Sequence, residues 1–295
     1  MKRFERVIGS WAEATTAGNA EVAQAAAMQA LAMCAEQELR NPSPDVLLMN
    51  EADELESKRD WSAAEAMRRK ILAIKESSGN FGVISKAQMD LCNFLRLVGK
   101  LDEAWRVGCA ATVSARHANI SVLLAMALVS EAFCALEAGC STEALAAASE
   151  AVQVIEPGKL YDMMRAKALA VRAKCLLACG DPIGAERDLD ASWELLKADS
   201  FFFVMPGPIF TLANWWEAKS QLEEQRGNIK GALEAMTNAL NYRRHGENPH
   251  ALLALSHALK KLGEISSTTQ DHEGEERFLS EAKSILENLH LPAGN

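Results

Sequence analysis

The sequence predicts an all-α protein made of about seven antiparallel helix hairpins stacked one on the next. A short phrase returns about every forty residues, small side chains recur at fixed distances from it, and glycine and proline stand between amphipathic stretches. Fixed periods of roughly 20 to 50 residues indicate stacked helical repeats. A hairpin alone leaves an apolar face uncovered, so neighbouring hairpins must pack together to bury it.

The recurring phrase is a glycine, a few polar residues and an alanine that opens an amphipathic helix. Glycine there favours a left-handed end for the first helix of a hairpin. An Asp, Ser or Thr just after the glycine can cap the second helix. The copies are GNAEVA (18–23), RDWSAA (59–64), GKLDEA (99–104), GCSTEA (139–144), GDPIGA (180–185), GNIKGA (227–232) and QDHEGE (270–275), of which RDWSAA and QDHEGE are the weaker.

Two further columns of residues repeat with the phrase. Small residues fill twelve of the fourteen places that lie seven residues after its last position or twelve before it. Two helices approach closely only where both present small side chains. The columns are Ala30, Ile71, Ala111, Ala151, Ser192, Ala239 and Ala282, and Trp11, Ala52, Cys92, Ala132, Ala173, Ser220 and Gly263.

These columns place the helices. First helices are expected near 2–16, 44–58, 81–98, 120–138, 160–179, 208–226 and 249–268, and second helices near 19–39, 61–77, 101–117, 141–156, 182–198, 229–244 and 272–289. We expect one solenoid over 1–295, with repeats near 1–40, 41–80, 81–119, 120–158, 159–200, 201–248 and 249–295. The sixth repeat is irregular and carries an aromatic insert at 200–210, and the seventh is a C-terminal cap.

Composition and motifs exclude several classes of function. A net charge of −9 argues against general binding to nucleic acid or to an anionic membrane. The start MKRFERVIGSWAEA lacks the apolar core of a secretory signal, and the seven scattered cysteines suit reduced, buried thiols, so a soluble cytoplasmic protein is expected. Without a phosphate loop, an HExxH motif or a nucleophile elbow, we expect no enzyme, no metal and no cofactor. His250 and His257 share a helix face but lack ligand neighbours, and we interpret them as ordinary core or surface residues.

Small residues at these spacings, with glycine in the interhelical turn, resemble the tetratricopeptide repeat. The forty-residue period is similar to the longer variant of kinesin light chains and bacterial signalling proteins, and AEAMRRKILAIKESSGN (64–80) resembles its second helix. The resemblance covers nearly the whole chain, with departures at Trp11, Ile71 and Glu275. It implies a right-handed α-solenoid that binds ligands on the concave side formed by the first helices.

The resemblance also indicates which positions face the groove. Positive side chains would flank an apolar step there, which suits a peptide that carries carboxylates or a free C-terminus. Asn93 matches a position where peptide-binding members of the family place an asparagine that bonds ligand backbone. The alternative is that the charged residues are solvated helix faces and the apolar ones simply pack. The predicted groove residues are Lys86, Met89, Asn93, Arg96, Met126, Val129, Phe133, Lys167 and Lys174.

The aromatic insert has two interpretations. It either fills an irregular repeat junction or forms an exposed interface for a partner or a second copy, since aromatic side chains anchor many interfaces. Trp216 falls where the repeat wants a large residue and is expected to be structural. The candidate interface residues are Phe201, Phe202, Phe203, Phe210 and Trp215.

Two functions fit this sequence. The first is an adapter that binds a peptide or a partner protein in the concave groove. The alternative is a regulatory or sensory subunit that controls a separate effector protein. The oligomeric state is not indicated by the residues.

Overall fold

The computed structural model describes residues 44–155, 162–198 and 206–292. The chain divides into two compact units, Met1–Asp53 and Glu54–Asn295, and helix α3 (Pro44–Ser57) crosses the boundary. The predicted first hairpin, at 1–40, lies outside the described residues. A single solenoid over the whole chain therefore remains a prediction.

The described residues form twelve α-helices and no strand. The predicted all-α hairpin architecture is confirmed, and the described helix ends lie within about two residues of the expected ones. After α3 the helices are α4 (Trp61–Ser77), α5 (Phe81–Leu97), α6 (Leu101–Ala118), α7 (Ser121–Glu137), α8 (Ser141–Val154), α9 (Asp162–Ala178), α10 (Pro182–Ala198), α11 (Pro206–Gln225), α12 (Ile229–Arg243), α13 (Pro249–Thr268) and α14 (His272–Leu289).

The turns within hairpins have the left-handed backbone that the glycines predict. Gly99, Gly139 and Gly180 have φ values of 75°, 80° and 79°. Arg59 and Gln270 occupy the same place in the weaker copies of the phrase and also have a positive φ, 61° in each. The turns therefore keep the left-handed backbone even where another residue replaces glycine. That residue carries a Cβ, which makes the left-handed conformation sterically unfavourable.

Capping of the second helices follows the prediction only in part. Asp60, Asp181, Asn228 and Asp271 each accept a hydrogen bond from the backbone N–H three residues further on, at 2.9–3.1 Å. The helices α6 and α8 begin after Lys100 and Cys140 without a side-chain cap. Ser141 is already the first residue of α8, so it is one place too late to act as the cap.

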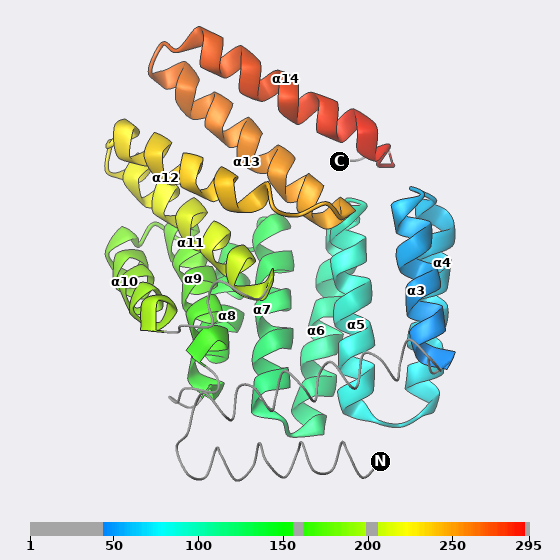
Figure 1. The fold of residues 1–295 in the computed structure, drawn as a ribbon. Helices are drawn as coiled ribbons and strands as arrows, with labels where there is room; N and C mark the ends of the chain where they lie inside the picture. Colours follow the sequence, from blue (N-terminus) through cyan, green and yellow to red (C-terminus); the bar gives the residue numbers. More distant parts are fainter. Residues whose placement is uncertain (1–43, 156–161, 199–205, 293–295) are drawn as a thin grey trace, which may run out of the picture. The chain divides into compact units, whose positions relative to one another are not determined.

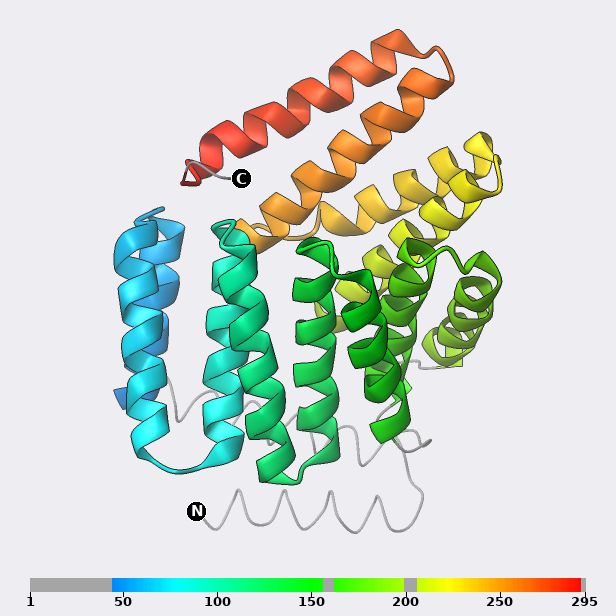
Figure 2. The same ribbon diagram turned by 180° about the vertical axis from the view of Figure 1, so that it is seen from behind.

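The small-residue columns lie where the helices cross. Ala104, Ala132, Ala144 and Ala151 are fully buried, as is Cys92. In addition to their contacts within hairpins, the first helices touch one another, α5 with α7, α7 with α9, and α9 with α11 (Figures 1 and 2). The inner layer is thus continuous from α5 to α11, because small side chains allow close approach.

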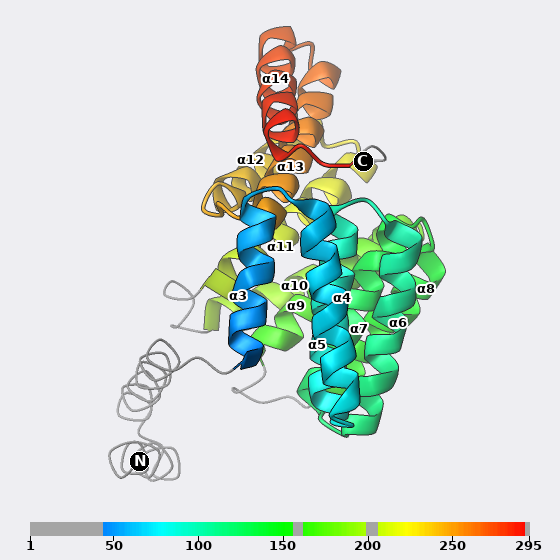
Figure 3. The ribbon, with the colours of Figure 1, turned by 90° about the vertical axis from the view of Figure 1, so that its right-hand side faces the viewer.

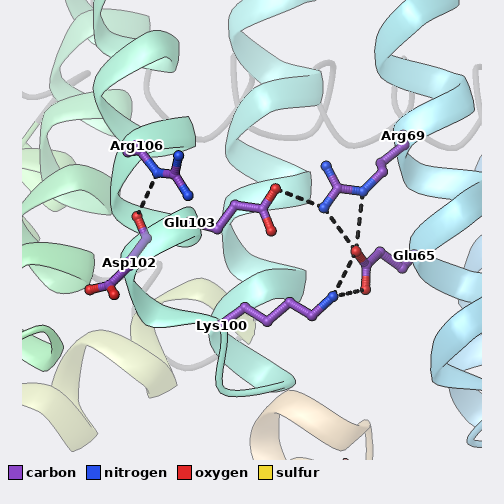
Figure 4. A network of polar contacts seen from close by, with 6 residues as sticks. All are labelled: Glu65, Arg69, Lys100, Asp102, Glu103 and Arg106. Carbon is purple, nitrogen blue, oxygen red and sulfur yellow. Dashed lines mark hydrogen bonds and ion pairs between the residues drawn. The ribbon is translucent and has the colours of Figure 1, made fainter.

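Ion pairs connect second helices of successive hairpins at the surface. Arg69 of α4 bonds Glu103 of α6 at 2.8 Å and its own neighbour Glu65, which also accepts from Lys100 (Figure 4). Arg106 turns back to the carbonyl of Asp102 instead. Exposed pairs of this kind contribute little individually, so packing in the crossings remains the main source of stability.

The last hairpin contacts the beginning of the same unit. Trp61, the first residue of α4, donates its indole N–H to the carbonyl of His290 at 2.8 Å. Leu253 of α13 and Leu291 pack against the cluster that contains Trp61 and Phe94, and α13 touches α5. Figures 1 and 3 show the C-terminal end of α14 beside α4.

Ala132 tests the role of the crossings. It is fully buried in a cluster with Ala144 and Ala148 of α8. Ala132→Leu should lower the free energy of unfolding by about 1–3 kcal/mol, because the added volume has no space between α7 and α8. The measurement is urea unfolding followed by circular dichroism. Ala146→Leu, at an exposed position of α8, is the matched control and should change stability by less than about 0.5 kcal/mol; equal effects of the two variants would contradict the assignment.

Candidate functional site

A cavity of about 1260 Å³ lies inside the second unit. Its wall comes mainly from the inner faces of α5, α7, α9, α11 and α13. It is completed by two residues of α12, by Leu101 at the start of α6 and by Asn248 before α13. The contributing side chains of each first helix recur at three- and four-residue intervals, as one face of a helix requires. The volume exceeds the roughly 300–1,000 Å³ common for drug-sized ligands and suits a peptide segment.

The most buried polar group of the wall is centred on Glu217 of α11. Its carboxylate accepts from Lys174 Nζ at 2.6 Å and from Arg243 Nε at 2.8 Å. Asn214 Oδ1 accepts from the same two cations, at 3.2 and 2.9 Å. Burial opposes ionisation of Glu217, but Lys174 and Arg243 outweigh it and lower the pKa of the carboxyl to about 2. Three helices, α9, α11 and α12, are therefore joined by an ionised cluster at the cavity surface.

A second polar group joins α5 to α7. The guanidinium of Arg96 bonds both carboxylate oxygens of Glu137, one of them through Nε at 2.8 Å. Its Cζ also lies 5.2 Å from the ring centroid of Phe133, and Lys174 Nζ lies 5.9 Å from the same ring. Cations near an aromatic face are attracted by its quadrupole. Phe133 thus forms an apolar step between two fixed positive groups.

Lys167 differs from the other cations of the wall. Within the described ranges its ammonium group has no carboxylate partner, and the residue is half-buried at the cavity. Burial lowers the pKa of Lys167, and the positive charge of Arg96 lowers it further. A half-buried ammonium with a cation beside it favours an anion from outside the chain.

The charge of the wall is opposite to that of the protein. Five lysine and arginine side chains line the cavity against three glutamates, an excess of two positive charges in a chain of net charge −9. Burial lowers the pKa of His257, so this ring adds no positive charge at neutral pH. Arg96, Lys174, Arg243 and Lys261 each have a glutamate partner.

Six of the nine predicted groove residues line the cavity: Asn93, Arg96, Val129, Phe133, Lys167 and Lys174. Three do not. Lys86 and Met126 are exposed in the first halves of their helices, outside the cavity, and Met89 is buried in a cluster with Ala111 and Ala115. Asn93 accepts a long 3.5 Å hydrogen bond from Arg96, and its bonding to a ligand backbone remains a prediction.

The five candidate interface residues of the aromatic insert do not lie together on one exposed surface within the described part of the chain. Phe201, Phe202 and Phe203 lie outside the described residues. Phe210 lines the cavity. Trp215 is 7% exposed and donates to the carbonyl of Leu189 at 2.8 Å, so it is a core residue and not an exposed anchor. Trp193 and Trp216 pack against it, with ring centroids 5.0 and 4.8 Å away.

Sequence reasoning missed the part of the wall that follows α11. Arg243 belongs to a second helix, and His250, His257 and Lys261 belong to the predicted cap. The shared helix face of His250 and His257 was the available signal. His250 also lies 3.4 Å from Glu56, which bonds Arg68.

Two other kinds of site are absent from the described residues. No group of three or more His, Cys, Asp or Glu side chains is placed to hold a metal ion there. None of the helices in those ranges has the length and apolar character needed to cross a bilayer.

Comparison with known proteins matches the fold and not the sequence. No family model matches the chain, and no curated protein matches it in sequence. Among solved structures, the apo form of RapI has a TM-score of 0.62 at 11% identity, covering 97% of this chain and 99% of that one. A Rap protein in complex with competence and sporulation factor has a TM-score of 0.59 at 14% identity, covering 95% and 73%.

A third matched structure contains a tetratricopeptide repeat. It is a signal transduction ATPase with numerous domains from Pyrococcus horikoshii, which has a tetratricopeptide repeat sensor. The TM-score is 0.50 at 15% identity, over 76% of this chain and only 34% of the ATPase. The chain has the tetratricopeptide-repeat fold. At these identities the likeness concerns the tetratricopeptide-repeat fold alone, and the resemblance inferred from the small-residue columns is confirmed at that level.

The ionised cluster predicts a pH dependence of stability. Glu217 has a folded-state pKa of about 2 against an ordinary value of 4.5, so its stabilisation is fully present above pH 4.5 and is lost as pH falls towards 2. Glu217→Gln should remove this contribution, roughly 2–3 kcal/mol. The measurement is urea unfolding at several pH values between 5 and 2.

The control is Glu234→Gln, which changes an exposed glutamate of α12. This variant should follow the wild-type pH profile. A Glu217→Gln profile parallel to that of the wild type would show that the cluster does not hold the carboxylate ionised.

Proposed function

We propose that this protein binds a peptide, or an extended or helical segment of a partner protein, in the cavity of its second unit. The ligand carries carboxylates. The observation that supports this most is Lys167, a half-buried cation at the wall that has no acidic partner among the described residues. A ligand carboxylate would supply the missing counter-charge and gain a charge-assisted hydrogen bond.

The rest of the wall supports the same ligand class. Phe133, Leu136 and Phe210 offer apolar surface, and Asn93 and Gln221 offer amide groups for a peptide backbone. The other cations already have glutamate partners, so their side chains are ordered before a ligand binds. Preorganisation of this kind favours binding because less freedom is lost on association.

A regulatory role is the second candidate. The observation that favours it is the fold likeness to a tetratricopeptide repeat sensor and to a Rap protein in complex with competence and sporulation factor. In this role ligand binding changes the curvature of the solenoid and so controls a separate effector. Small-angle scattering distinguishes the two: a changed profile with ligand favours regulation, and an unchanged profile favours a rigid adapter.

The test of the proposal begins with a library of random peptides with free C-termini, displayed and selected on the full chain. Enriched peptides should carry Asp or Glu. Their dissociation constants are then measured by fluorescence anisotropy against the wild type and two variants. Lys167→Met should weaken binding at least tenfold, equivalent to about 1.4 kcal/mol.

Lys86→Met is the matched control, because it removes the same charge from an exposed position on α5 outside the cavity. It should bind as the wild type does. Changing the essential acid of the peptide to its amide should weaken wild-type binding and have little further effect on Lys167→Met. Enriched peptides that still bind after their acidic side chains are removed and their C-terminus is amidated, or equal affinities for the two lysine variants, would refute the proposal.

A further inference from the structure

Two cysteines meet inside the wall between α5 and α7. The sulfur atoms of Cys92 and Cys134 lie 2.9 Å apart, and both residues are fully buried. Six of the seven cysteines are in the described ranges, and among those six this is the one sulfur–sulfur contact. A disulfide bond of about 2.05 Å requires the sulfurs to approach by less than roughly 1 Å, which side-chain rotation can supply.

The neighbouring helix is shaped to leave room for the pair. Gly108 of α6 faces both sulfurs: a Cβ there would lie 3.5 Å from Cys92 Sγ and 3.8 Å from Cys134 Sγ. It would also lie 3.3 Å from the backbone of Glu131. The distances to the two sulfurs are ordinary van der Waals contacts, and the tight one is to the backbone of Glu131, so the absence of a side chain at Gly108 lets α6 lie close against α7 beside the two thiols.

We propose that Cys92 and Cys134 form a reversible disulfide that crosslinks α5 to α7 when a peroxide oxidises the protein. The crosslink fixes the spacing of two helices that carry Asn93, Arg96, Phe133 and Glu137 at the cavity. Cys92 immediately precedes Asn93, and Cys134 immediately follows Phe133. This modification does not depend on the identity of any cavity ligand.

The chemistry balances with one peroxide molecule. The sulfur of Cys92 attacks a peroxide oxygen, the O–O bond breaks, and one water leaves with Cys92 as a sulfenic acid. The sulfur of Cys134 then attacks the Cys92 sulfur, the S–O bond breaks, and a second water leaves. Two thiols are oxidised by two electrons, and the peroxide is reduced to two waters.

The electrostatics favour Cys92 as the first nucleophile. Either thiol can donate across the 2.9 Å contact. With Cys134 as the donor the contact lowers the pKa of Cys92, burial opposes this, and the positive charge of Arg96 adds to the lowering. The same contact, together with burial, raises the pKa of Cys134. Thiolates are the reactive form of cysteine, so the two sulfurs have distinct roles.

The experiment treats the ligand-free full chain with hydrogen peroxide, blocks remaining thiols with N-ethylmaleimide, and maps tryptic peptides without reduction. Trypsin leaves Cys134 and Cys140 in one peptide, 117–159, so the mapping uses Cys140→Ser as well as the wild type. The peptides of Cys92 and Cys134 should appear joined, lighter by two hydrogens, and should separate with dithiothreitol. If Cys140→Ser fails to fold, fragmentation of the joined wild-type peptides locates the bond instead.

Thermal unfolding provides the second readout. Oxidation should raise the Tm of the wild type by roughly 5 °C or more, because the crosslink restricts the unfolded chain. Cys134→Ala should show no such rise, whereas Cys179→Ala, which changes an exposed cysteine, should keep both the crosslink and the rise. Recovery of Cys92 and Cys134 as free thiols, as separate over-oxidised residues, or joined to other cysteines would overturn the proposal.

Discussion

Close approach of helices at small side chains is the constraint on which this structure depends. The buried columns of alanine, serine and glycine bring the two helices of each hairpin together and let first helices touch across hairpins. Large residues are then left to fill the grooves between the crossings. One face of each first helix is used in this packing, and the opposite face remains available to line a cavity. The same residues that give stability therefore also determine where a ligand can bind.

The cavity wall balances most of its own charge. Glu217 is ionised between Lys174 and Arg243, and Glu137 is held by Arg96. Taking charges out of water is costly, and partners at hydrogen-bonding distance offset that cost. Lys167 is the exception in the described wall, which makes one position decisive for an acidic ligand while the surrounding network stays fixed. Specificity then depends on a local charge that the net charge of the protein conceals.

The helices and their hairpins could be predicted because one packing problem recurs at every crossing and is solved each time with small residues. The cavity positions on α5, α7 and α9 followed from the place of each residue in the repeat, as for Asn93, Phe133 and Lys174. Lys86 and Met126, also predicted to face the groove, lie outside the cavity. The cavity lies against the C-terminal halves of α5 and α7, where α13 returns to touch α5. That return depends on rotation accumulated over several hairpins, which no single repeat encodes.

For the same reason, the repeat pattern did not predict that Arg243 and His257 line the cavity. It also did not predict the contact between Trp61 and His290. Trp215, a candidate interface residue in sequence, is buried for a local reason: its indole N–H donates to the carbonyl of Leu189, so its polar atom is satisfied inside the core. Cys92 and Cys134 lie on neighbouring first helices about one repeat apart, and the direct packing of α5 against α7 brings their sulfurs together. The repeat pattern therefore predicts the helices but not which side chains of different helices contact one another.

The central claim is that first helices present the ligand-binding face. Amide hydrogen exchange at short labelling times, with and without an acidic peptide selected on the protein, tests this most directly. The account predicts slower exchange in the C-terminal halves of α5 and α7 and along α9 and α11, with α6, α8 and α10 unchanged. Protection concentrated in those second helices would contradict it.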